Sequence, residues 1–220
     1  VPGVPSAQVL VLGGGVVGTS AIRMALGMGA DVTVIDRSVK RLTELDEQYG
    51  GRLRTVYSTA DAIEEAASHA DLIIGAVLIA GASAPKLITR DMLKKLKPGT
   101  VMVDVAIDQG GCFETSTPTT HADPTYVIDQ IVHYCVANMP GAVARTATMA
   151  LTNATLPYIQ RLAHGDLDAL LKDDPHFANG LNIREGKVTH PAVAAALASA
   201  TTERSATPLA EPARSMGNAA

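Results

Sequence analysis

Three glycines near the amino terminus have the spacing of a phosphate-binding loop. The run GGGVVG contains the pattern G-x-G-x-x-G, formed by Gly13, Gly15 and Gly18. Gly13 permits a tight turn out of a strand, Gly15 lets the backbone approach a pyrophosphate, and Gly18 lets a helix pack close to the strand. The N-terminus of that helix favours an anion. The pattern indicates a dinucleotide-binding loop; the alternative is that the glycines only permit tight packing.

An acidic residue stands where the adenosine ribose of a dinucleotide would need it. Asp36 follows the predicted strand Asp31–Ile35, downstream of the glycines. A carboxylate there can accept hydrogen bonds from both ribose hydroxyls and repels a 2′-phosphate, so NAD is favoured over NADP. Arg37 weakens this preference, because an arginine can accommodate the phosphate. The alternative is that Asp36 is a turn residue without a ligand.

Two further polar residues follow predicted strands and could act on a substrate. Asp108 lies beyond Thr100–Asp104, next to a Gly-Gly pair that leaves room for a ligand. Its carboxylate could support proton transfer, although an Asx turn that opens the loop is the alternative. Asn138 lies beyond Ile131–Val136, and its amide can hold a carbonyl or carboxamide. Lys86 could bind an anion or could be a solvated loop lysine.

Other kinds of catalytic site are not indicated by the sequence. The six histidines show no metal-ligand spacing, so no metal is predicted. No G-x-S-x-G motif or Cys-His arrangement indicates a nucleophile. Cys112 and Cys135 do not form a C-x-x-C pair, and we expect free thiols in a reducing cytoplasm.

The elements that must position these residues alternate between strands and helices. A helix is expected after each of the first two strands, and another between Thr89 and Lys97. The predicted strands are Gln8–Gly13, Asp31–Ile35, Leu53–Tyr57, Leu72–Val77, Thr100–Asp104 and Ile131–Val136. Several are apolar throughout, which is typical of a parallel sheet covered on both faces. The pattern predicts an α/β fold with a Rossmann-type doubly wound sheet, whose ligands bind beyond the carboxyl ends of the strands.

The alternation of strands and helices ends after Pro140. The following residues predict helices, including Thr146–Leu162, and a small hairpin at Asn182–Thr189. We therefore expect a dinucleotide-binding domain over 1–140, a helical part of an incomplete second domain over 141–200, and a disordered tail over 201–220. The length of 220 residues agrees, because at roughly 150 residues per domain it gives about one and a half domains.

Composition narrows the possible partners. The chain is 47% hydrophobic and only 18% charged, with a net charge of −4, which excludes disorder as its main state. No basic cluster indicates nucleic acid. The longest mostly apolar run, Leu72–Ala84, is too short for a membrane helix, and no secretory signal is visible. We expect a cytoplasmic protein that contacts neither nucleic acid nor membrane.

Longer stretches carry a more specific signal than the glycine loop. They are VLGGGVVGTSAIRMALGMGADVTVIDR, ADLIIGAVLIAGASAPKLITRDML, KPGTVMVDVAIDQGGCFETSTPTTH, HYCVANMPGAV and ALTNATLPY. Through these the chain resembles the alanine dehydrogenase family, which shares ancestry with the NAD-binding subunit of proton-pumping transhydrogenase. The resemblance runs over nearly the whole chain. It implies NAD as cofactor and the interconversion of L-alanine with pyruvate and ammonia.

The resemblance also assigns roles to individual residues. It implies that the pyrophosphate lies against Gly15, Val16, Val17 and Gly18, and that Asp36 binds the adenine ribose with Arg41 and Ser58 nearby. The residues implied to line the nicotinamide half are Val77, Leu78, Val105, Val136, Asn138 and Met139. Asp108 matches the active-site aspartate of the family, is also expected to contact the cofactor, and could orient ammonia or water. Asn138 could orient the carboxamide or the substrate.

The chain differs from the family in one large respect. In the family, an N-terminal half of the substrate domain supplies an arginine, a lysine and a histidine to the active site, and none of these has a counterpart here. We expect the chain alone to bind NAD without turning over alanine, and the family implies a homohexamer. The alternative is a stand-alone NAD-binding module, or a transhydrogenase-like subunit that acts with a partner chain. Asp108 favours the dehydrogenase, because the transhydrogenase subunits look to carry an amide there.

Overall fold

The computed structural model describes residues 2–77, 84–195 and 197–198. The chain forms two compact units that divide between Met149 and Ala150. The first unit holds the sheet and the second is mainly helical.

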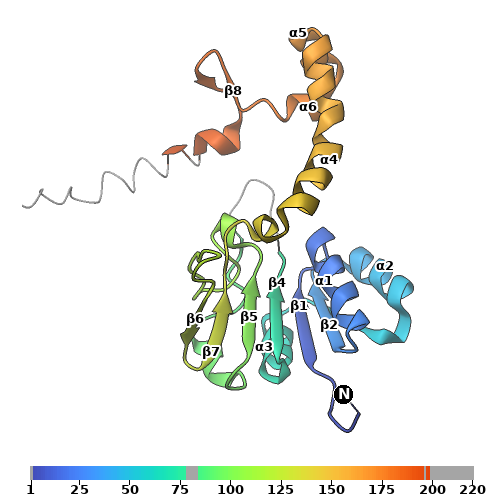
Figure 1. The fold of residues 1–220 in the computed structure, drawn as a ribbon, viewed down its shortest axis with the longest axis vertical. Helices are drawn as coiled ribbons and strands as arrows, with labels where there is room; N and C mark the ends of the chain where they lie inside the picture. Colours follow the sequence, from blue (N-terminus) through green and yellow to red (C-terminus); the bar gives the residue numbers. More distant parts are fainter. Residues whose placement is uncertain (1, 78–83, 196, 199–220) are drawn as a thin grey trace, which may run out of the picture. The chain divides into compact units, whose positions relative to one another are not determined.

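A seven-stranded sheet forms the centre of the first unit (Figure 1). Its strands are β1 (Gln8–Leu12), β2 (Asp31–Asp36), β3 (Leu53–Tyr57), β4 (Leu72–Gly75), β5 (Val101–Asp104), β6 (Thr125–Ile128) and β7 (Ile131–Tyr134). The strand order is β3-β2-β1-β4-β5-β7-β6, and every pair is parallel except β6 with β7. The order reverses at β1 and β4, which is where such sheets bind ligands. The predicted doubly wound α/β fold is confirmed.

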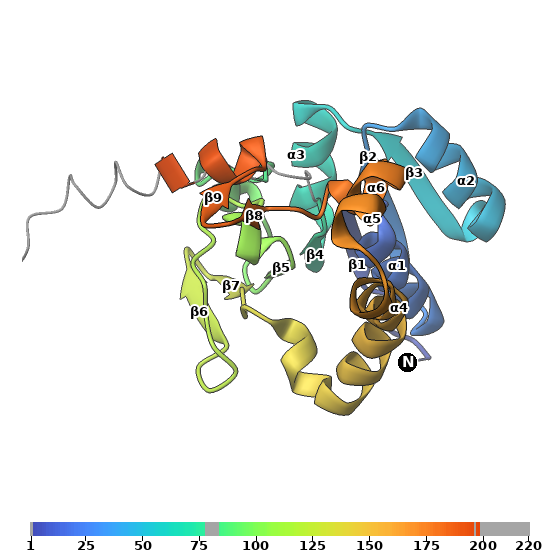
Figure 2. The ribbon, with the colours of Figure 1, turned by 90° about the horizontal axis from the view of Figure 1, so that it is seen from above.

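Helices lie on both faces of the sheet (Figure 2). Apolar side chains form one buried cluster on each face. The covering helices of the nucleotide-binding half are α1 (Val16–Gly27), α2 (Val39–Tyr49) and α3 (Ala60–His69). Because side chains alternate along a strand, Val9 and Val11 of β1 pack with Ile22 of α1, whereas Leu10 and Leu12 belong to the core of α3. This two-sided burial explains why β1 is apolar throughout.

Side-chain caps start two of these helices. The Ser38 hydroxyl accepts a hydrogen bond from the Arg41 N–H at the start of α2. The Thr59 hydroxyl accepts one from the Ala62 N–H at the start of α3. No side chain caps α1, which begins directly after the glycine loop.

The prediction of a helix between Thr89 and Lys97 is wrong. The structure has only a 3-10 helix there, η2 (Asp91–Lys95). Ile88 forms a parallel bridge with Phe113, which keeps the chain extended before the helix can start. Pro98 disfavours helical backbone at the residue before it. These two limits confine any helix to residues 89–96.

The antiparallel edge strand β6 is a feature that the sequence did not reveal. It pairs with β7 through a two-residue turn, in which Asp129 and Gln130 have φ angles of 50° and 66°. A turn with two positive φ angles usually contains Asn-Gly or Asp-Gly, and Asp129-Gln130 lacks the glycine. The usual signal of a hairpin is therefore absent from the sequence.

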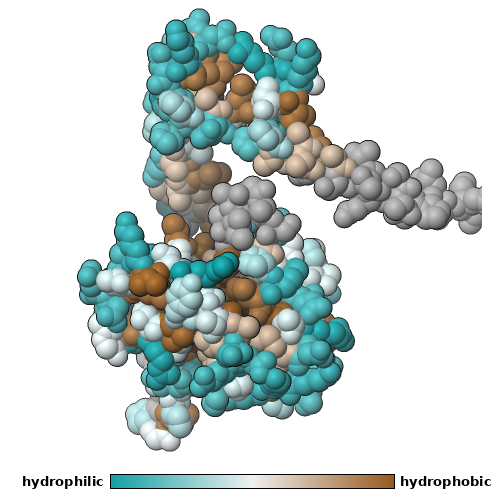
Figure 3. Space-filling model, turned by 180° about the vertical axis from the view of Figure 1, so that it is seen from behind, coloured by the Kyte–Doolittle hydropathy of each residue, from teal (hydrophilic) through white to brown (hydrophobic). Residues whose placement is uncertain are grey.

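The second unit contains helices and one small hairpin. Its elements are the greater part of α4 (Ala144–His164), α5 (Leu167–Asp173), α6 (Pro175–Ala178), β8 (Ile183–Arg184) and β9 (Lys187–Val188). The hairpin predicted around Glu185-Gly186 is confirmed by the pairing of β8 with β9. Hydrophobic side chains are visible on the surface of this unit (Figure 3). In the part of the chain that the structure describes, no helix combines the length and apolarity needed to cross a membrane. The tail predicted over 201–220 lies outside the described residues.

Candidate functional site

The three glycines of the fingerprint have different surroundings at the carboxyl end of β1. A Cβ on Gly13 would lie 2.8 Å from the carbonyl oxygen of Ala76, and its φ of +97° already favours glycine. A Cβ on Gly18 would collide with the carbonyl oxygen of Gly13. A Cβ on Gly15 would meet no atom of the described residues within 4 Å. Gly13 and Gly18 are therefore required by packing, whereas Gly15 keeps a surface open for a ligand.

A cavity of about 460 Å³ lies beside this loop at the carboxyl ends of the strands. The predicted cofactor residues that line it are Gly13, Gly15, Val16, Val17, Asp36, Ser58 and Val77. The other lining residues, of which only Arg37 had been considered from the sequence, are Leu12, Ile35, Arg37, Ile63, Ala76, Pro85 and Leu87. The last group is mostly apolar, and only its position beyond strand ends could have indicated it from the sequence. The lining combines an apolar surface, the glycine loop and one carboxylate.

Asp36 is both a lining residue and an anchor for the loop. Its Oδ2 accepts a hydrogen bond from the Gly14 N–H at 2.7 Å, and its Oδ1 accepts one from the Ser38 N–H at 2.8 Å. An ionised carboxylate has about four acceptor positions, so two remain for a ligand. Asp36 therefore holds the glycine loop and still presents acceptors at the cavity.

Arg41 is directed at the backbone of the glycine loop. Its Nε donates to the Gly14 carbonyl at 2.7 Å, and its Nη2 donates to the Thr19 hydroxyl at 2.6 Å. Its Nη1 forms an ion pair with Glu44 at 2.7 Å. Arg41 does not line the cavity beside Asp36 but a neighbouring one that includes Gly15 and Val16. Its direct effect in the structure is to fix the loop.

Asp108 lies on a loop that is held by a buried acid. Asp104, at the end of β5, is fully buried and accepts hydrogen bonds from the N–H groups of Ala106, Cys112 and Phe113. This shows Asp104 to be the structural acid of this strand end. Burial raises the pKa of the Cys112 thiol, and the nearby Asp104 carboxylate raises it further. The thiol therefore stays protonated and is a poor nucleophile.

The Asp108 side chain itself is exposed. It sits in the 3-10 turn η3 (Ile107–Gln109) and has no hydrogen bond or ion pair with any described residue. Its carboxylate is therefore available to a ligand or to another part of a larger protein. Asp108 does not line the cavity beside the glycine loop.

Lys86 contacts the same loop from the neighbouring strand end. Its Nζ donates to the carbonyl oxygens of Gly110 and Gly111 at 2.5 Å and 2.8 Å. The ammonium thus binds main-chain carbonyls, which neither sequence interpretation of Lys86 anticipated.

The remaining predicted residues lie outside the cavity lining. Asn138 is exposed and has the left-handed φ and ψ of 56° and 51°, and its carbonyl oxygen lies 3.0 Å from Nε2 of His121. Val136 is fully buried, Val105 and Met139 are partly buried, and Leu78 lies outside the described residues. The cavity thus brings together the glycine loop, Asp36, Ser58 and Val77, the last of which was predicted for the nicotinamide half. Arg41, Asn138 and Met139 do not line it.

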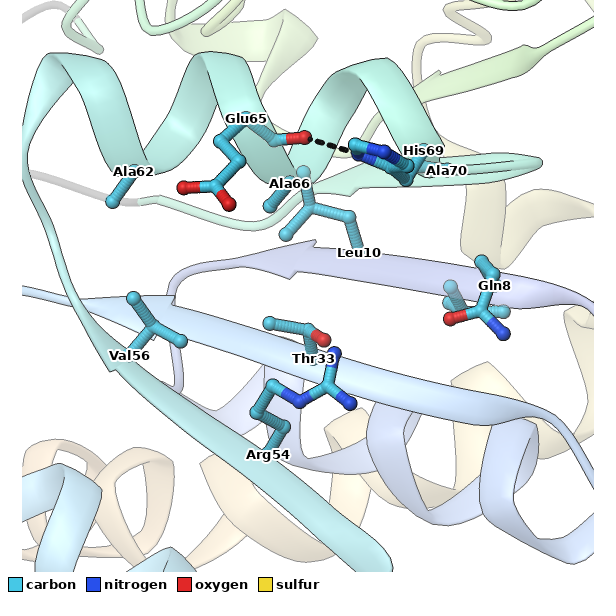
Figure 4. A pocket seen from close by; sticks show the side chains of 11 residues that line it. Gln8, Leu10, Thr33, Arg54, Val56, Ala62, Glu65, Ala66, His69 and Ala70 are labelled. Carbon is cyan, nitrogen blue, oxygen red and sulfur yellow. Dashed lines mark hydrogen bonds between the residues drawn. The ribbon is translucent and has the colours of Figure 1, made fainter.

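A second cavity lies between α3 and strands β1 to β3 (Figure 4). It measures about 220 Å³ and includes Gln8 at the start of β1, Arg54 and Glu65. His69 also lines it, but its Nδ1 is directed at the Glu65 carbonyl of its own helix, 3.0 Å away. No residue of the glycine loop lines this cavity. Within the described ranges, no group of three or more His, Cys, Asp or Glu residues could hold a metal ion.

Comparisons with known proteins agree with the geometry of the loop. The family "Alanine dehydrogenase/PNT, C-terminal domain" matches residues 1–191. The alanine dehydrogenase of Halomonas elongata is 68% identical over 89% of this chain and 53% of that relative. The alanine dehydrogenase of Mycolicibacterium smegmatis is 52% identical over 88% of this chain and 52% of that relative. The chain therefore spans about half the length of these curated relatives.

Solved structures of the same two kinds of protein are similar to this chain. An L-alanine dehydrogenase superimposes with a TM-score of 0.83 at 49% identity, covering 90% of this chain and 55% of that chain. A transhydrogenase from Sinorhizobium meliloti superimposes with a TM-score of 0.69 at 27% identity, covering 86% of this chain and 51% of that chain. The dehydrogenase structure is the more similar of these two.

Proposed function

Because the chain belongs to the alanine dehydrogenase/PNT C-terminal domain family, we propose that it is the NAD-binding part of an L-alanine dehydrogenase. The proposed reaction is the oxidative deamination of L-alanine to pyruvate and ammonia. The observation that carries the proposal is the glycine loop joined to Asp36 at a cavity beyond the strand ends. The identity of 68% to a curated alanine dehydrogenase supports the same assignment.

The residues of the cavity fit NAD. Gly15 has open space where a Cβ would stand, and no side chain caps the α1 N-terminus that follows it. A pyrophosphate could therefore approach the unpaired N–H groups of the first turn. Val16 and Val17 are 88% and 46% exposed, so they can pack against the dinucleotide. Asp36 keeps acceptor positions for the ribose hydroxyls and disfavours a 2′-phosphate.

In the proposed reaction, bound NAD supplies the hydride acceptor. Asp108 is the residue of this chain that we assign to the proton transfer, because its carboxylate is exposed and has no partner among the described residues. It can orient the amino group, ammonia or water beside the reacting carbon and exchange a proton with it. Asn138 can orient a carboxamide or the substrate through its exposed amide.

The rest of the substrate site is proposed to come from the part of the relatives that this chain does not span. We propose that the chain alone binds NAD and that turnover needs this other half. We also propose that the whole enzyme is a cytoplasmic homohexamer, by resemblance to the family. Exposed apolar residues on α4, such as Leu156 and Ile159, support an assembly surface.

Titration calorimetry with NAD and NADP on this chain is the first test. We expect NAD to bind and NADP to bind more weakly. A second test joins the chain to the corresponding front half of an alanine dehydrogenase and follows NADH formation with L-alanine. Binding without any turnover in the joined protein would favour the alternative, a stand-alone NAD-binding module or a transhydrogenase-like subunit.

A further inference from the structure

The ammonium of Lys86 is the link between two segments that follow neighbouring strands. Lys86 lies on the segment after β4, and the carbonyls that it binds lie on the loop after β5. Those carbonyls belong to Gly110 and Gly111, which directly follow the turn that carries Asp108. Lys86 therefore holds the main chain two and three residues beyond the proposed acid.

These two carbonyls have no other donor among the described residues. The glycines have φ angles of 85° and 74°, in the left-handed region that favours glycine. Lys86 forms no ion pair with any described carboxylate. Its charge is therefore directed at the loop, where charge-assisted hydrogen bonds are stronger than those between neutral groups.

Backbone hydrogen bonds place Lys86 inside a paired segment. The Ala84 N–H donates to the Gln109 carbonyl at 3.1 Å, and the Leu87 N–H donates to the Cys112 carbonyl at 2.7 Å. Between these two bonds, the Lys86 side chain supplies the donors that Gly110 and Gly111 need. The segment 84–87 and the segment 109–112 are therefore joined along their length.

The two residues next to Lys86 in the sequence face the cavity beside the glycine loop. Pro85 and Leu87 line the cavity beside the glycine loop, whereas Lys86 contacts the Asp108 loop. One short segment thus contributes alternate residues to the proposed cofactor cavity and to the loop of the proposed acid. The segment that lines the cavity is therefore also the segment that is hydrogen-bonded to the Asp108 loop.

We propose that Lys86 is a positioning residue, which fixes the Asp108 loop against the segment that lines the NAD cavity and couples occupancy of that cavity to the placement of Asp108. This inference rests on the proposed function for the role of Asp108. Lys86 itself contacts backbone atoms and takes no part in proton transfer. A small displacement of a reacting group is enough to slow a reaction strongly, so loss of this link should act on turnover more than on binding.

The test compares Lys86→Met, Lys86→Arg and the control Lys94→Met. Lys94 is a surface lysine paired with Asp91, with 71% of its side chain exposed. In the chain joined to its dehydrogenase front half, we expect Lys86→Met to lower kcat by about tenfold or more and to change the Kd of NAD by less than about threefold. Lys86→Arg keeps a charged donor and should recover most of kcat. Lys94→Met should match the unsubstituted protein.

Amide hydrogen exchange of this chain gives a readout that needs no activity. In Lys86→Met, the amides of 109–112 should exchange faster, and NAD should protect them less than in the unsubstituted chain. Lys86→Arg should restore the protection. If Lys86→Met does not fold, as judged by circular dichroism, Lys86→Gln replaces it.

Several outcomes would overturn the proposal. They are unchanged exchange at 109–112 in the neutral variant, unchanged kcat despite faster exchange, and an equal loss of kcat in the Met and Arg variants. If the unsubstituted joined protein shows no turnover, the proposed function fails, and the exchange data alone then decide whether Lys86 links NAD occupancy to the loop.

Discussion

The carboxylate of Asp36 and the N–H of Gly14 are joined by a hydrogen bond of 2.7 Å. This bond ties the end of β2 to the glycine loop that follows β1, two segments that are neighbours in the parallel sheet. Arg41 reinforces the tie by donating to the carbonyl of the same Gly14 at 2.7 Å. The main-chain donor and acceptor of Gly14 are therefore both bound by side chains, and the loop is organised by the acid that also faces the cavity.

Replacing Asp36 should affect both the loop and the ligand. We expect Asp36→Ala to weaken NAD binding by at least about 1 kcal/mol, because an acceptor for the ribose and the anchor of Gly14 are both lost. Asp36→Asn keeps an acceptor for the Gly14 N–H and should weaken NAD binding less. Both variants should discriminate less against NADP, because the negative charge is removed. Calorimetry with both cofactors measures these effects.

Asp46→Ala is the matched control for this experiment. Asp46 lies on α2, and its side chain is exposed to solvent. Its substitution should leave both affinities unchanged. Equal NAD affinities for the Asp36→Ala chain and the unsubstituted chain would remove Asp36 from the binding site.

Alanine substitutions at two glycines of the fingerprint should distinguish an effect on the stability of the fold from an effect on NAD binding. Gly18→Ala places a Cβ against the Gly13 carbonyl, so it should destabilise the fold by roughly 1–3 kcal/mol. The methyl group of Gly15→Ala meets no atom within 4 Å in the part of the chain that the structure describes, so this substitution should leave the unfolding midpoint nearly unchanged. Its methyl group would instead obstruct the pyrophosphate and weaken NAD binding. Urea unfolding and calorimetry measure the two effects, and strong NAD binding by Gly15→Ala would contradict the placement of the pyrophosphate.

The sequence predicted most of the sheet because its signals are local. Uniformly apolar strands such as β1, with helices between them, are typical of a doubly wound fold, and Gly13 to Gly18 mark the first turn. The β6–β7 hairpin was missed because Asp129-Gln130 adopts positive φ angles without a glycine. The prediction of a helix over Thr89–Lys97 was wrong because the pairing of Ile88 with Phe113, a tertiary contact, limits where a helix can start.

The site could be predicted only in part because side-chain direction depends on distant partners. The sequence placed Asp36 near the glycine loop, but it could not show that both its oxygens accept backbone hydrogen bonds. Lys86 and its carbonyl partners are 24 and 25 residues apart in the chain, and Arg41 and Gly14 are 27 apart. A lysine or arginine looks the same in the sequence whether its side chain binds an anion, water or the main chain.

Asp108→Asn tests the proposed acid directly. In the chain joined to its dehydrogenase front half, we expect the substitution to lower kcat by about a hundredfold or more, because the amide cannot exchange a proton. The Kd of NAD should change little, since Asp108 does not line the cavity beside the glycine loop. Steady-state kinetics and calorimetry measure the two quantities. Full turnover by the Asn variant would end the assignment of Asp108 to proton transfer.

His133 should make the stability of the fold depend on pH. It is fully buried on β7, with Nε2 2.8 Å from the Thr115 hydroxyl and Nδ1 3.1 Å from the Ile131 carbonyl. Burial lowers its pKa below 6.5, against the opposing effects of the Ile131 carbonyl and the Asp104 charge. The unfolded chain therefore binds a proton at a higher pH than the folded chain does. The free energy of unfolding should fall as the pH drops below about 6.5, until the folded pKa is reached.

Urea unfolding between pH 7.5 and pH 5 would measure this effect. His133→Gln should be less stable than the unsubstituted chain at pH 7.5, because a buried hydrogen-bonded ring is replaced, but its stability should vary less over this range. The control is His164→Gln, because His164 is exposed at the end of α4 and should leave the pH dependence unchanged. If His133→Gln kept the full pH dependence, another group would carry it.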